Sequence, residues 1–383
     1  MFRFFIASRL ASGRDLFFEM ACSVETALFD MMINDICIYY FRLPFVRPMR
    51  VGKKTLLDRE GFLVRLSDDD GSVGYGEVAP LPGLDAFTLA SCRKELQVFS
   101  RMVKTGASDN RHFNPVVCFG LESAIFSLAT GKSDAVAGCP DFRMEAAVNG
   151  LFVPGSDPDA ENALINRLLL CGCKTIKVKI GKLSIDKEVA SIRRLYERAG
   201  GDVLFRLDGN RSLSPGVYKK YYQAMGDLPV EYAEEPLKNG DFERAKDIGW
   251  PLAIDESLPS YWDKENCRLH GLPGAVTHVI VKSSTPAGFR TVMRYFIENE
   301  NSGLLPVVSS VFHSVYGICS MMLFLRQVPG ADHTAHGLDT GAFLRSDLAG
   351  DVVRVENGRM SARMNVLWEK ESPDFRLLTE IEA

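Results

Sequence analysis

Long hydrophobic runs and an excess of basic residues are both missing from this sequence of 383 residues. No stretch of about 18 uncharged apolar residues occurs, so no segment is predicted to span a membrane. Lysine and arginine together number 45, against 49 aspartate and glutamate residues, which gives a net charge of −4. The chain therefore has no overall positive field to hold a nucleic-acid backbone, and we expect no nucleic-acid partner.

The cysteine pattern of a disulfide framework or zinc motif is also missing. The nine cysteines are an odd number, and the close pair Cys171 and Cys173 has the wrong spacing for a redox or zinc motif. This pattern favours a reduced, cytoplasmic setting. Arg9 interrupts the apolar start Met1–Leu16, which argues against a secretory signal. With 46% hydrophobic and 25% charged residues, the composition is that of a globular protein with a substantial core.

The first third of the chain predicts an α+β domain. Residues 1–35 have no chemistry that points to a role, and an Asp-Gly turn at 68–71 then separates extended runs. The predicted strands are Ile36–Phe45, Gly61–Leu66 and Val73–Val78, and the predicted helices are Leu89–Val103 and Phe119–Ala129. The basic segment Pro48–Leu57 is predicted to be either a lid over an anionic substrate or an ordinary solvated loop.

The middle of the chain alternates short β-branched runs with amphipathic stretches. The first such helix follows Ser184, a plausible N-cap, and Gly200 supplies its stop. The predicted strands are Thr175–Ile180, Val203–Leu207, Val230–Ala233, Leu252–Ile254, Val276–Val281 and Leu304–Val308. Alternating strands and helices indicate a parallel sheet. We favour a closed barrel over an open doubly wound sheet, because no glycine-rich phosphate loop follows a first strand.

Polar residues follow these strands at regular intervals. Counted from Lys179 they lie 29, 26, 21, 27 and 27 residues apart, about one strand, helix and loop each. Each unit of a barrel would therefore deliver one functional group to the same rim. The predicted rim residues are Lys177, Lys179, Asp208, Glu234, Asp255, Lys282, Ser309 and Ser310.

Lys177 and Lys179 are two residues apart on one strand, so both face the barrel interior while the apolar residues face the helices. A structural salt bridge is one interpretation. The other is catalytic: two adjacent ammonium groups lower each other's pKa, which would bring one of them toward the range of a general base. Lys282 follows a strand on the far side of the barrel, so a substrate would lie between lysines.

Asp208, Glu234 and Asp255 end three consecutive strands. Like charges about 4 Å apart repel by about 4 kcal/mol per pair at an effective dielectric constant near 20, so three ionised carboxylates need a cation. Oxygen ligands without histidine or cysteine favour Mg²⁺, with Mn²⁺ as the alternative. The structural interpretation is that these residues are N-caps of the following helices.

In these motifs the chain resembles the enolase superfamily and, within it, the o-succinylbenzoate synthase family. The resemblance covers about residues 36–348 and implies a (β/α)7β TIM-like barrel of the α/β class under an α+β capping domain. The domains predicted from it are an extension at 1–35, the capping domain at 36–145, the barrel at 146–345 and a C-terminal segment at 346–383 that returns to the cap. The motifs are Gly74–Gly83 (GYGEVAPLPG), Lys177–Lys179, Arg206–Arg211 (RLDGNR), Glu234–Pro236, Asp255–Ser257, Val281–Lys282, Ser309–Ser310 and Gly337–Thr340 (GLDT).

The resemblance implies a carbon–oxygen lyase of the EC 4.2.1 class in menaquinone biosynthesis. Its substrate, a small anionic carboxylate, would be 2-succinyl-6-hydroxy-2,4-cyclohexadiene-1-carboxylate, dehydrated in a syn elimination through an enediolate to o-succinylbenzoate. Lys179 would be the acid/base, Lys282 would stabilise the enediolate, and Lys177 would tune Lys179. The implied Mg²⁺ ligands are Asp208, Glu234 and Asp255, and the implied substrate-site residues are Arg206, Asn210, Ser309 and Ser310.

Other functions remain open at the level of sequence. N-succinylamino acid racemases, dipeptide epimerases and muconate cycloisomerases of the same superfamily share the lysines and carboxylates. An epimerase would be expected to show Asp-x-Asp near the eighth strand, where this chain has Asp339 followed by Thr340 and Gly341. A catalytically silent metal-binding scaffold would not need both Lys179 and Lys282. The sequence does not indicate whether the protein is a monomer or a homo-oligomer.

Overall fold

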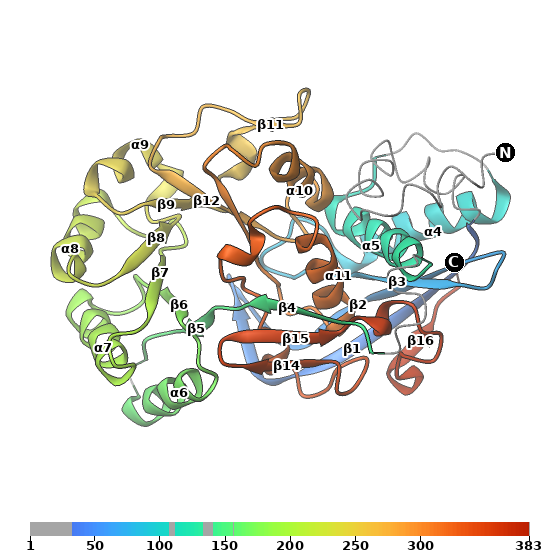
Figure 1. Ribbon diagram of the computed structural model, residues 1–383, viewed down its shortest axis with the longest axis horizontal. Helices are drawn as coiled ribbons and strands as arrows, with labels where there is room; N and C mark the ends of the chain where they lie inside the picture. Colours follow the sequence, from blue (N-terminus) through green and yellow to red (C-terminus); the bar gives the residue numbers. More distant parts are fainter. Residues whose placement is uncertain (1–32, 107–111, 133–140, 156, 383) are drawn as a thin grey trace.

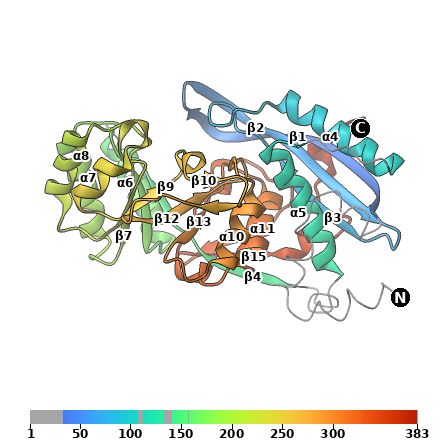
Figure 2. The same ribbon diagram turned by 90° about the horizontal axis from the view of Figure 1, so that it is seen from above.

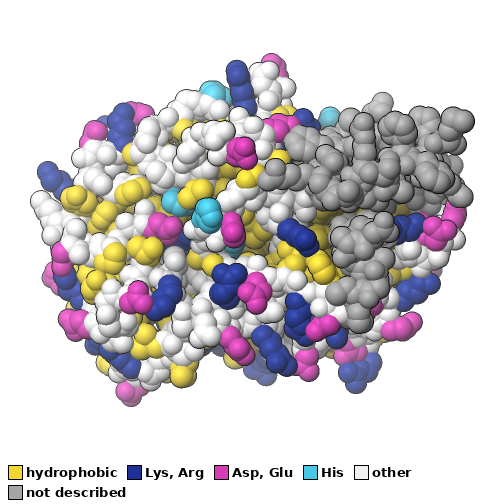
Figure 3. Space-filling view, viewed as in Figure 1, with side chains coloured by type: hydrophobic (Ala, Val, Ile, Leu, Met, Phe, Trp, Pro, Cys, Tyr) yellow, Lys and Arg dark blue, Asp and Glu magenta, His cyan; other side chains and the backbone are white. Residues whose placement is uncertain are grey.

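The computed structural model describes residues 33–106, 112–132, 141–155 and 157–382 (Figure 1). Nearly all of the predicted extension at residues 1–35 lies outside the described residues. In the described part, no helix combines the length and the apolar character needed to cross a membrane. Basic and acidic side chains are interspersed on the face that Figure 3 shows, in keeping with the small net charge.

A parallel sheet of seven strands curls into a barrel, in the order β13-β12-β9-β8-β7-β6-β5. A short segment closes the ring as an eighth position: His336 bridges Val148, and Gly337 bridges Ser309, both in parallel. The barrel predicted from the alternating pattern is thus observed, with the (β/α)7β topology that the family resemblance implies. The strands are β5 Gly150–Phe152, β6 Thr175–Lys179, β7 Leu204–Asp208, β8 Val230–Glu234, β9 Leu252–Ile254, β12 Val276–Val281 and β13 Leu305–Val308.

Helices cover the outside of the barrel and bury their apolar faces against it. In α7, Ile192 and Leu195 are buried, and the positive φ of Gly200 follows its end, as predicted. Ser184 stands at the predicted N-cap position but makes no side-chain cap hydrogen bond. Instead, the buried Glu188 accepts hydrogen bonds from the amides of residues 181–183. The helices are α6 Pro158–Leu170, α7 Ile185–Arg198, α8 Pro215–Met225, α9 Phe242–Ala245, α10 Phe289–Glu298 and α11 Val315–Leu325, and a small hairpin, β10 Trp262–Asp263 with β11 Arg268–Leu269, follows β9.

The capping domain is an antiparallel sheet, ordered β16-β1-β2-β3, that packs on two helices (Figure 2). The C-terminal strand β16 pairs with β1, so the end of the chain returns to the cap. A three-stranded sheet, ordered β14-β15-β4, lies beside the barrel. The bounds are β1 Ile33–Val51, β2 Lys54–Asp68, β3 Val73–Val78, α4 Leu89–Thr105, α5 Pro115–Gly131, β4 Arg143–Ala147, β14 Val353–Glu356, β15 Arg359–Arg363 and β16 Leu378–Glu380.

The segment Pro48–Leu57 is a strand hairpin and not an irregular loop, and its role as a lid over the substrate stays a prediction. It forms the tip of the β1–β2 hairpin, where Met49 pairs with Leu56 and Val51 with Lys54. A register shift between Pro44 and Met49 carries the pairing past Pro48, which cannot donate to a strand ladder.

Among the described residues, the apolar core of the barrel has two parts. Between sheet and helices lies a large apolar layer, to which the outward-facing Ile176, Val178 and Leu207 belong. Inside the barrel lies a small apolar cluster of Tyr232, Ala253, Ile280 and Val307. The interior is therefore filled below the rim, and polar groups are left at the carboxyl ends of the strands, where barrel enzymes carry their sites.

Candidate active site

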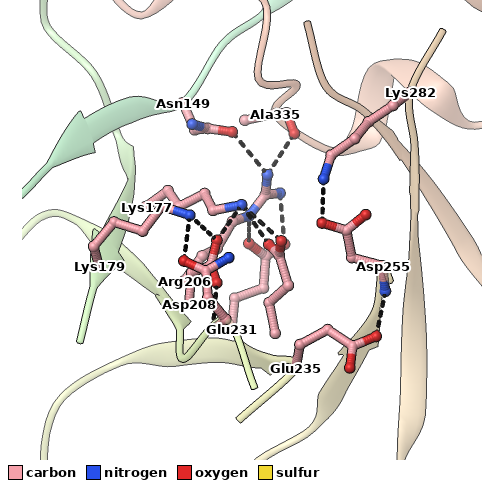
Figure 4. A network of polar contacts seen from close by, with 12 residues as sticks. Asn149, Lys177, Lys179, Arg206, Asp208, Glu231, Glu235, Asp255, Lys282 and Ala335 are labelled. Carbon is pink, nitrogen blue, oxygen red and sulfur yellow. Dashed lines mark hydrogen bonds and ion pairs between the residues drawn. The ribbon is translucent and has the colours of Figure 1, made fainter. Parts of the chain in front are cut away.

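Lys177 and Lys179 extend from β6 into the barrel, as the strand alternation predicts (Figure 4). Both ammonium groups contact one carboxylate oxygen: Nζ of Lys177 lies 2.7 Å, and Nζ of Lys179 2.6 Å, from Oδ2 of Asp208 on β7. Lys179 also donates to the amide oxygen of Asn210 at 2.8 Å. The salt bridges that a purely structural role would predict for these lysines are therefore present. Their partner, however, is Asp208, which is itself one of the predicted rim residues.

Glu234 ends β8 on the other side of Lys177. Nζ of Lys177 donates to its two carboxylate oxygens at 2.8 and 2.6 Å. Glu234 and Asp208 are each only 1% exposed. One lysine thus bridges two buried carboxylates on neighbouring strands.

Asp255 and Lys282 form a second pair on the opposite side of the opening (Figure 4). Lys282 follows β12, which stands four strand positions from β6 in the ring of eight. The fully buried Glu235 fixes the segment that carries Asp255, because it accepts from the amides of Asp255 and Ser257 at 3.0 and 2.7 Å. Arg211 donates to the same Glu235 carboxylate at 3.1 Å. Lysine charge therefore stands on both sides of the barrel axis.

The carboxylates are not helix caps. The helical segments that follow β7, β8 and β9 have Ser214, Asp241 and Ser257 at their N-cap positions. The interpretation of the rim carboxylates as N-caps is therefore wrong for these helices.

Burial and ion pairing act on the lysines in opposite directions. Burial lowers the pKa of the Lys177 ammonium, but Asp208 and Glu234 outweigh it and raise that pKa well above its ordinary value. The pKa of Lys282 is likewise raised, to about 12, because neighbouring carboxylates outweigh its burial. The prediction that adjacent ammonium groups lower each other's pKa is therefore wrong for Lys177, since the carboxylates dominate its surroundings.

The net pKa shifts of the three carboxylates differ, although burial acts to raise all three. Burial, aided by the charge of Asp208, raises the pKa of Glu234 to about 7. Burial raises the pKa of Asp255 as well. For Asp208, burial also acts to raise the pKa, but Lys177 and Lys179 prevail and hold it well below its usual range. Two of the three carboxylates are thus incompletely compensated by the lysines.

Among the described side chains, no three carboxylate, imidazole or thiol groups are already gathered in a way that could hold a metal ion. The donor chemistry nevertheless fits a divalent cation. Asp208, Glu234 and Asp255 are oxygen donors at the ends of three adjacent strands, the first two fully buried and the third with a side chain only 8% exposed. Glu234 and Asp255 have raised pKa values that a nearby cation would relieve. These residues would hold Mg²⁺ or Mn²⁺.

Arg206 lies one layer below the rim, because it precedes Asp208 by two residues on β7. Its fully buried guanidinium donates to Glu231 at 2.6 Å, to the carbonyl of Ala335 at 2.6 Å and to the hydroxyl of Thr334 at 2.7 Å. The structure thus ties Arg206 into the barrel interior, away from the rim where a substrate contact was predicted.

Asn210 lies at the rim, directly beyond β7. Its backbone is left-handed, with φ 42°, and its backbone N–H donates to Oδ1 of Asp208 at 3.0 Å. Because its side chain also accepts from Lys179, it orders the acid/base candidate and the carboxylate together.

Ser309 and Ser310 lie beyond β13 at the same end of the barrel. The amide of Ser309 donates to Val281 at 2.9 Å, and the hydroxyl of Ser310 lies 2.7 Å from that of Thr340. Ser309 is partly exposed, whereas Ser310 is buried. Their contact with a substrate carboxylate stays a prediction.

Glu231 is a polar partner in the barrel interior that the sequence pattern did not reveal. It stands next to the inward-facing Tyr232, so strict alternation would point it outward. A register shift between β7 and β8, at Phe205 and Arg206, accompanies its contact with Arg206. Such a shift depends on strand pairing and leaves no local signal.

Comparison with known proteins places the chain in a family. The model of the MenC N-terminal domain matches residues 33–128, and the enolase C-terminal domain-like model matches residues 161–365, more than half of the chain. The o-succinylbenzoate synthase of Photorhabdus laumondii subsp. laumondii is 28% identical over 316 residues, which cover 81% of this chain and 91% of that protein.

Solved structures share the fold. The dipeptide epimerase from Methylococcus capsulatus, complexed with Mg and a dipeptide, has a TM-score of 0.69 at 20% identity and covers 87% of this chain and 97% of its own. The muconate lactonizing enzyme from Mucobacterium smegmatis has a TM-score of 0.66 at 21% identity, with coverage of 92% and 97%. The two matched family models show that the chain is an enzyme of the enolase superfamily with a MenC-type N-terminal domain.

Proposed function

We propose that this chain is an o-succinylbenzoate synthase, a carbon–oxygen lyase that acts in the cytoplasm in menaquinone biosynthesis. It would dehydrate 2-succinyl-6-hydroxy-2,4-cyclohexadiene-1-carboxylate to o-succinylbenzoate and water. The observation that carries the proposal is the pair of lysine groups on opposite strands, with buried carboxylates between them. The MenC-type N-terminal domain and the similarity to the Photorhabdus synthase support this substrate over others.

Lys179 is the proposed acid/base. Its neutral amine takes the proton from the ring carbon that bears the carboxylate and becomes an ammonium group. That ammonium then gives the proton to the departing hydroxyl on the same face of the ring. The hydroxyl leaves as water, the electron pair of the broken C–H bond completes the aromatic ring, and Lys179 returns to its starting state. Asn210 and Asp208 orient the Lys179 side chain, since both contact its Nζ.

Lys282 faces the opposite side of the substrate in this proposal. Its positive charge would stabilise the enediolate as negative charge develops on the substrate carboxylate. Lys177 is held between Asp208 and Glu234 and would set the field at Lys179 rather than move a proton. Ser309 and Ser310 would meet a carboxylate of the substrate.

Asp208, Glu234 and Asp255 would hold the divalent ion, which we propose is Mg²⁺, with Mn²⁺ as the alternative. The ion would act as a Lewis acid toward the substrate carboxylate and lower the barrier to proton removal. The dipeptide epimerase neighbour complexed with Mg supports a divalent metal.

Racemisation or epimerisation is the second candidate, because lysines on both faces could exchange a proton at one carbon. The surroundings of the eighth strand speak against an epimerase. The carboxylate of Asp339 lies 3.8 Å from the Arg167 guanidinium, and the hydroxyl of Thr340 pairs with Ser310. Asp339 is therefore already engaged by a cation and is a poor partner for a substrate ammonium group.

The test is an assay of the purified protein with Mg²⁺, in which o-succinylbenzoate is identified by mass spectrometry. We expect product formation that chelation abolishes and added Mg²⁺ restores. The same preparation is incubated in D₂O with N-succinylamino acids and dipeptides, and separately with muconate. Deuterium uptake at the α-carbon or lactone formation, without dehydration, would replace the proposal with the corresponding alternative.

A further inference from the structure

The glycines of the Gly74–Gly83 motif bring β3 unusually close to α5. A Cβ atom added at Gly74 would lie 2.2 Å, and one at Gly76 1.9 Å, from backbone carbonyl oxygens of α5. A side chain at either position would therefore push the strand away from the helix. Because strand residues alternate, Tyr75 and Glu77 face the other way, toward the barrel.

Glu77 caps a barrel helix from the capping domain. It is fully buried, and its Oε2 accepts from the amide and hydroxyl of Ser314 at 3.0 and 2.5 Å and from the amide of Gly317 at 3.1 Å. These donors belong to the first turn of α11, where a negative charge is favourable. Beside it, the ring of Tyr75 packs 5.3 Å from that of Tyr316.

Arg59 on β2 makes a second contact between the capping domain and the segment that precedes α11. It is 1% exposed, and its Nε donates to the carbonyl of Phe312 at 3.1 Å while Nη1 donates to that of Pro80 at 2.7 Å. Phe312 has φ 61°, a left-handed conformation that is costly for a bulky residue. The ring of Phe312 also meets that of Phe45 of the cap at 5.4 Å. The capping domain thus holds a strained residue just before α11.

The segment between β13 and α11 is therefore anchored at both ends by different domains. At its start, the amides of Ser309 and Ser310 donate to Val281 and Gly337 of the barrel at 2.9 and 2.8 Å. At its end, Arg59 and Glu77 hold it to the cap. A shift of the cap would reach the two serines through this short segment.

We propose that Arg59 and Glu77 are positioning residues of the active site. By clamping residues 312–317 to the capping domain, they set the place of Ser309 and Ser310 and so the affinity for the substrate carboxylate. This inference rests on the proposed function, in which these serines meet that carboxylate. No role could be predicted for Gly74–Glu77 from the pattern of residues alone. In this proposal the two glycines let β3 approach α5, and the segment presents Glu77 to α11.

The kinetic test compares Glu77→Ala and Glu77→Gln with a matched control. Glu122 on α5 is also a largely buried carboxylate and lies 3.5 Å from Arg290 on α10, so Glu122→Gln perturbs the same domain boundary away from the segment. We expect Glu77→Ala to raise KM about tenfold while kcat changes less than about threefold. Glu77→Gln keeps an acceptor oxygen for Ser314 and should recover most of the loss, and Glu122→Gln should leave KM unchanged.

A wild-type KM in folded Glu77→Ala would overturn the inference, as would an equal rise of KM in Glu122→Gln. Amide hydrogen exchange in the substrate-free protein provides a second, independent readout. Glu77→Ala should speed exchange at Ser314 and Gly317 at least about tenfold and leave α10 unchanged. Arg59→Lys, measured in the same way, covers the case in which Glu77→Ala does not fold. Unchanged exchange in both variants would refute the clamp, and failure of the wild-type enzyme to dehydrate its substrate would refute only the proposed function.

Discussion

The barrel interior contains two polar layers that differ in how their charges are held. At the rim, Lys177 and Lys179 share one oxygen of Asp208. Below it, Arg206 is held by the charged Glu231 and also by uncharged acceptors. Burial acts to raise the pKa of Glu231, but His278 and Arg206 lower it to about 2, so Glu231 is ionised at neutral pH.

The difference separates structural charge from catalytic charge. If the Arg206 guanidinium moved to another partner, the backbone and hydroxyl oxygens that it now bonds would be left buried without a donor, which is costly. Ammonium groups that contact only side-chain oxygens can exchange those partners for a metal ion or a substrate. We therefore expect the lower layer to govern stability and the rim to govern the rate of reaction.

Removal of Arg206 should give the largest effect on stability. Arg206→Met removes the nearer cationic partner of Glu231, so the free energy of unfolding should fall by about 3–5 kcal/mol. Urea denaturation measures this, and the double variant Arg206→Met with Glu231→Leu should regain part of the loss. A loss below about 1 kcal/mol would erase the distinction between the layers.

Removal of Lys282 should affect the rate instead. Lys282→Ala takes away the charge that faces the developing enediolate, so kcat should fall by about 10² to 10³. Unfolding of the same sample, followed by circular dichroism, should change less than that of Arg206→Met. If Lys282→Ala unfolded easily but turned over normally, the charge at β12 would be structural.

His336, which closes the barrel, should make stability depend on pH. Its Nδ1 accepts from Val308 and its Nε2 donates to Ala331, and burial lowers its pKa to about 4. Between pH 6.5 and 4 the unfolded chain binds a proton that the folded chain does not. The free energy of unfolding should therefore fall by up to about 3 kcal/mol as the pH drops through this range.

The check is the urea midpoint of the wild type and of His336→Asn from pH 4.5 to 7.5. The variant should be less stable at pH 7, and its midpoint should depend less on pH. Equal slopes for both proteins would contradict the assignment.

Lys174 provides the smallest expected effect and the matched control for its neighbours on β6. It pairs with Asp202, but the two side chains are 68% and 76% exposed. Lys174→Ala should change stability by less than about 1 kcal/mol and leave kcat unaltered. A large change in kcat would mean that charge anywhere near β6, and not the buried rim, controls the reaction.

The sequence predicted the barrel and its rim well, because both depend on local signals. Short β-branched runs marked every barrel strand except β5, and most rim residues stand at or just beyond a strand end. The pairing of the β1–β2 hairpin beyond Pro44 and the sheet of β4, β14 and β15 were not predicted, since they depend on distant partners. The helix α11 also gave no signal, because all of its residues are buried and it lacks a polar face.

Roles within the rim were only partly predictable. The sequence placed Lys177 and Lys179 on one face, but their pKa directions depend on Asp208 and Glu234, which come from other strands. Glu231 faced inward only through a register shift. The pKa shift of Lys177 depends on side chains of β7 and β8, so the residues of β6 alone do not predict it.

The most direct test of the account is the rate of dehydration by Lys179→Ala, measured with Mg²⁺ on protein shown to be folded. Loss of the acid/base should lower kcat by about 10² to 10⁴, while Lys174→Ala reacts at the wild-type rate. Turnover of Lys179→Ala within about threefold of the wild type would show that the proton is moved by another group.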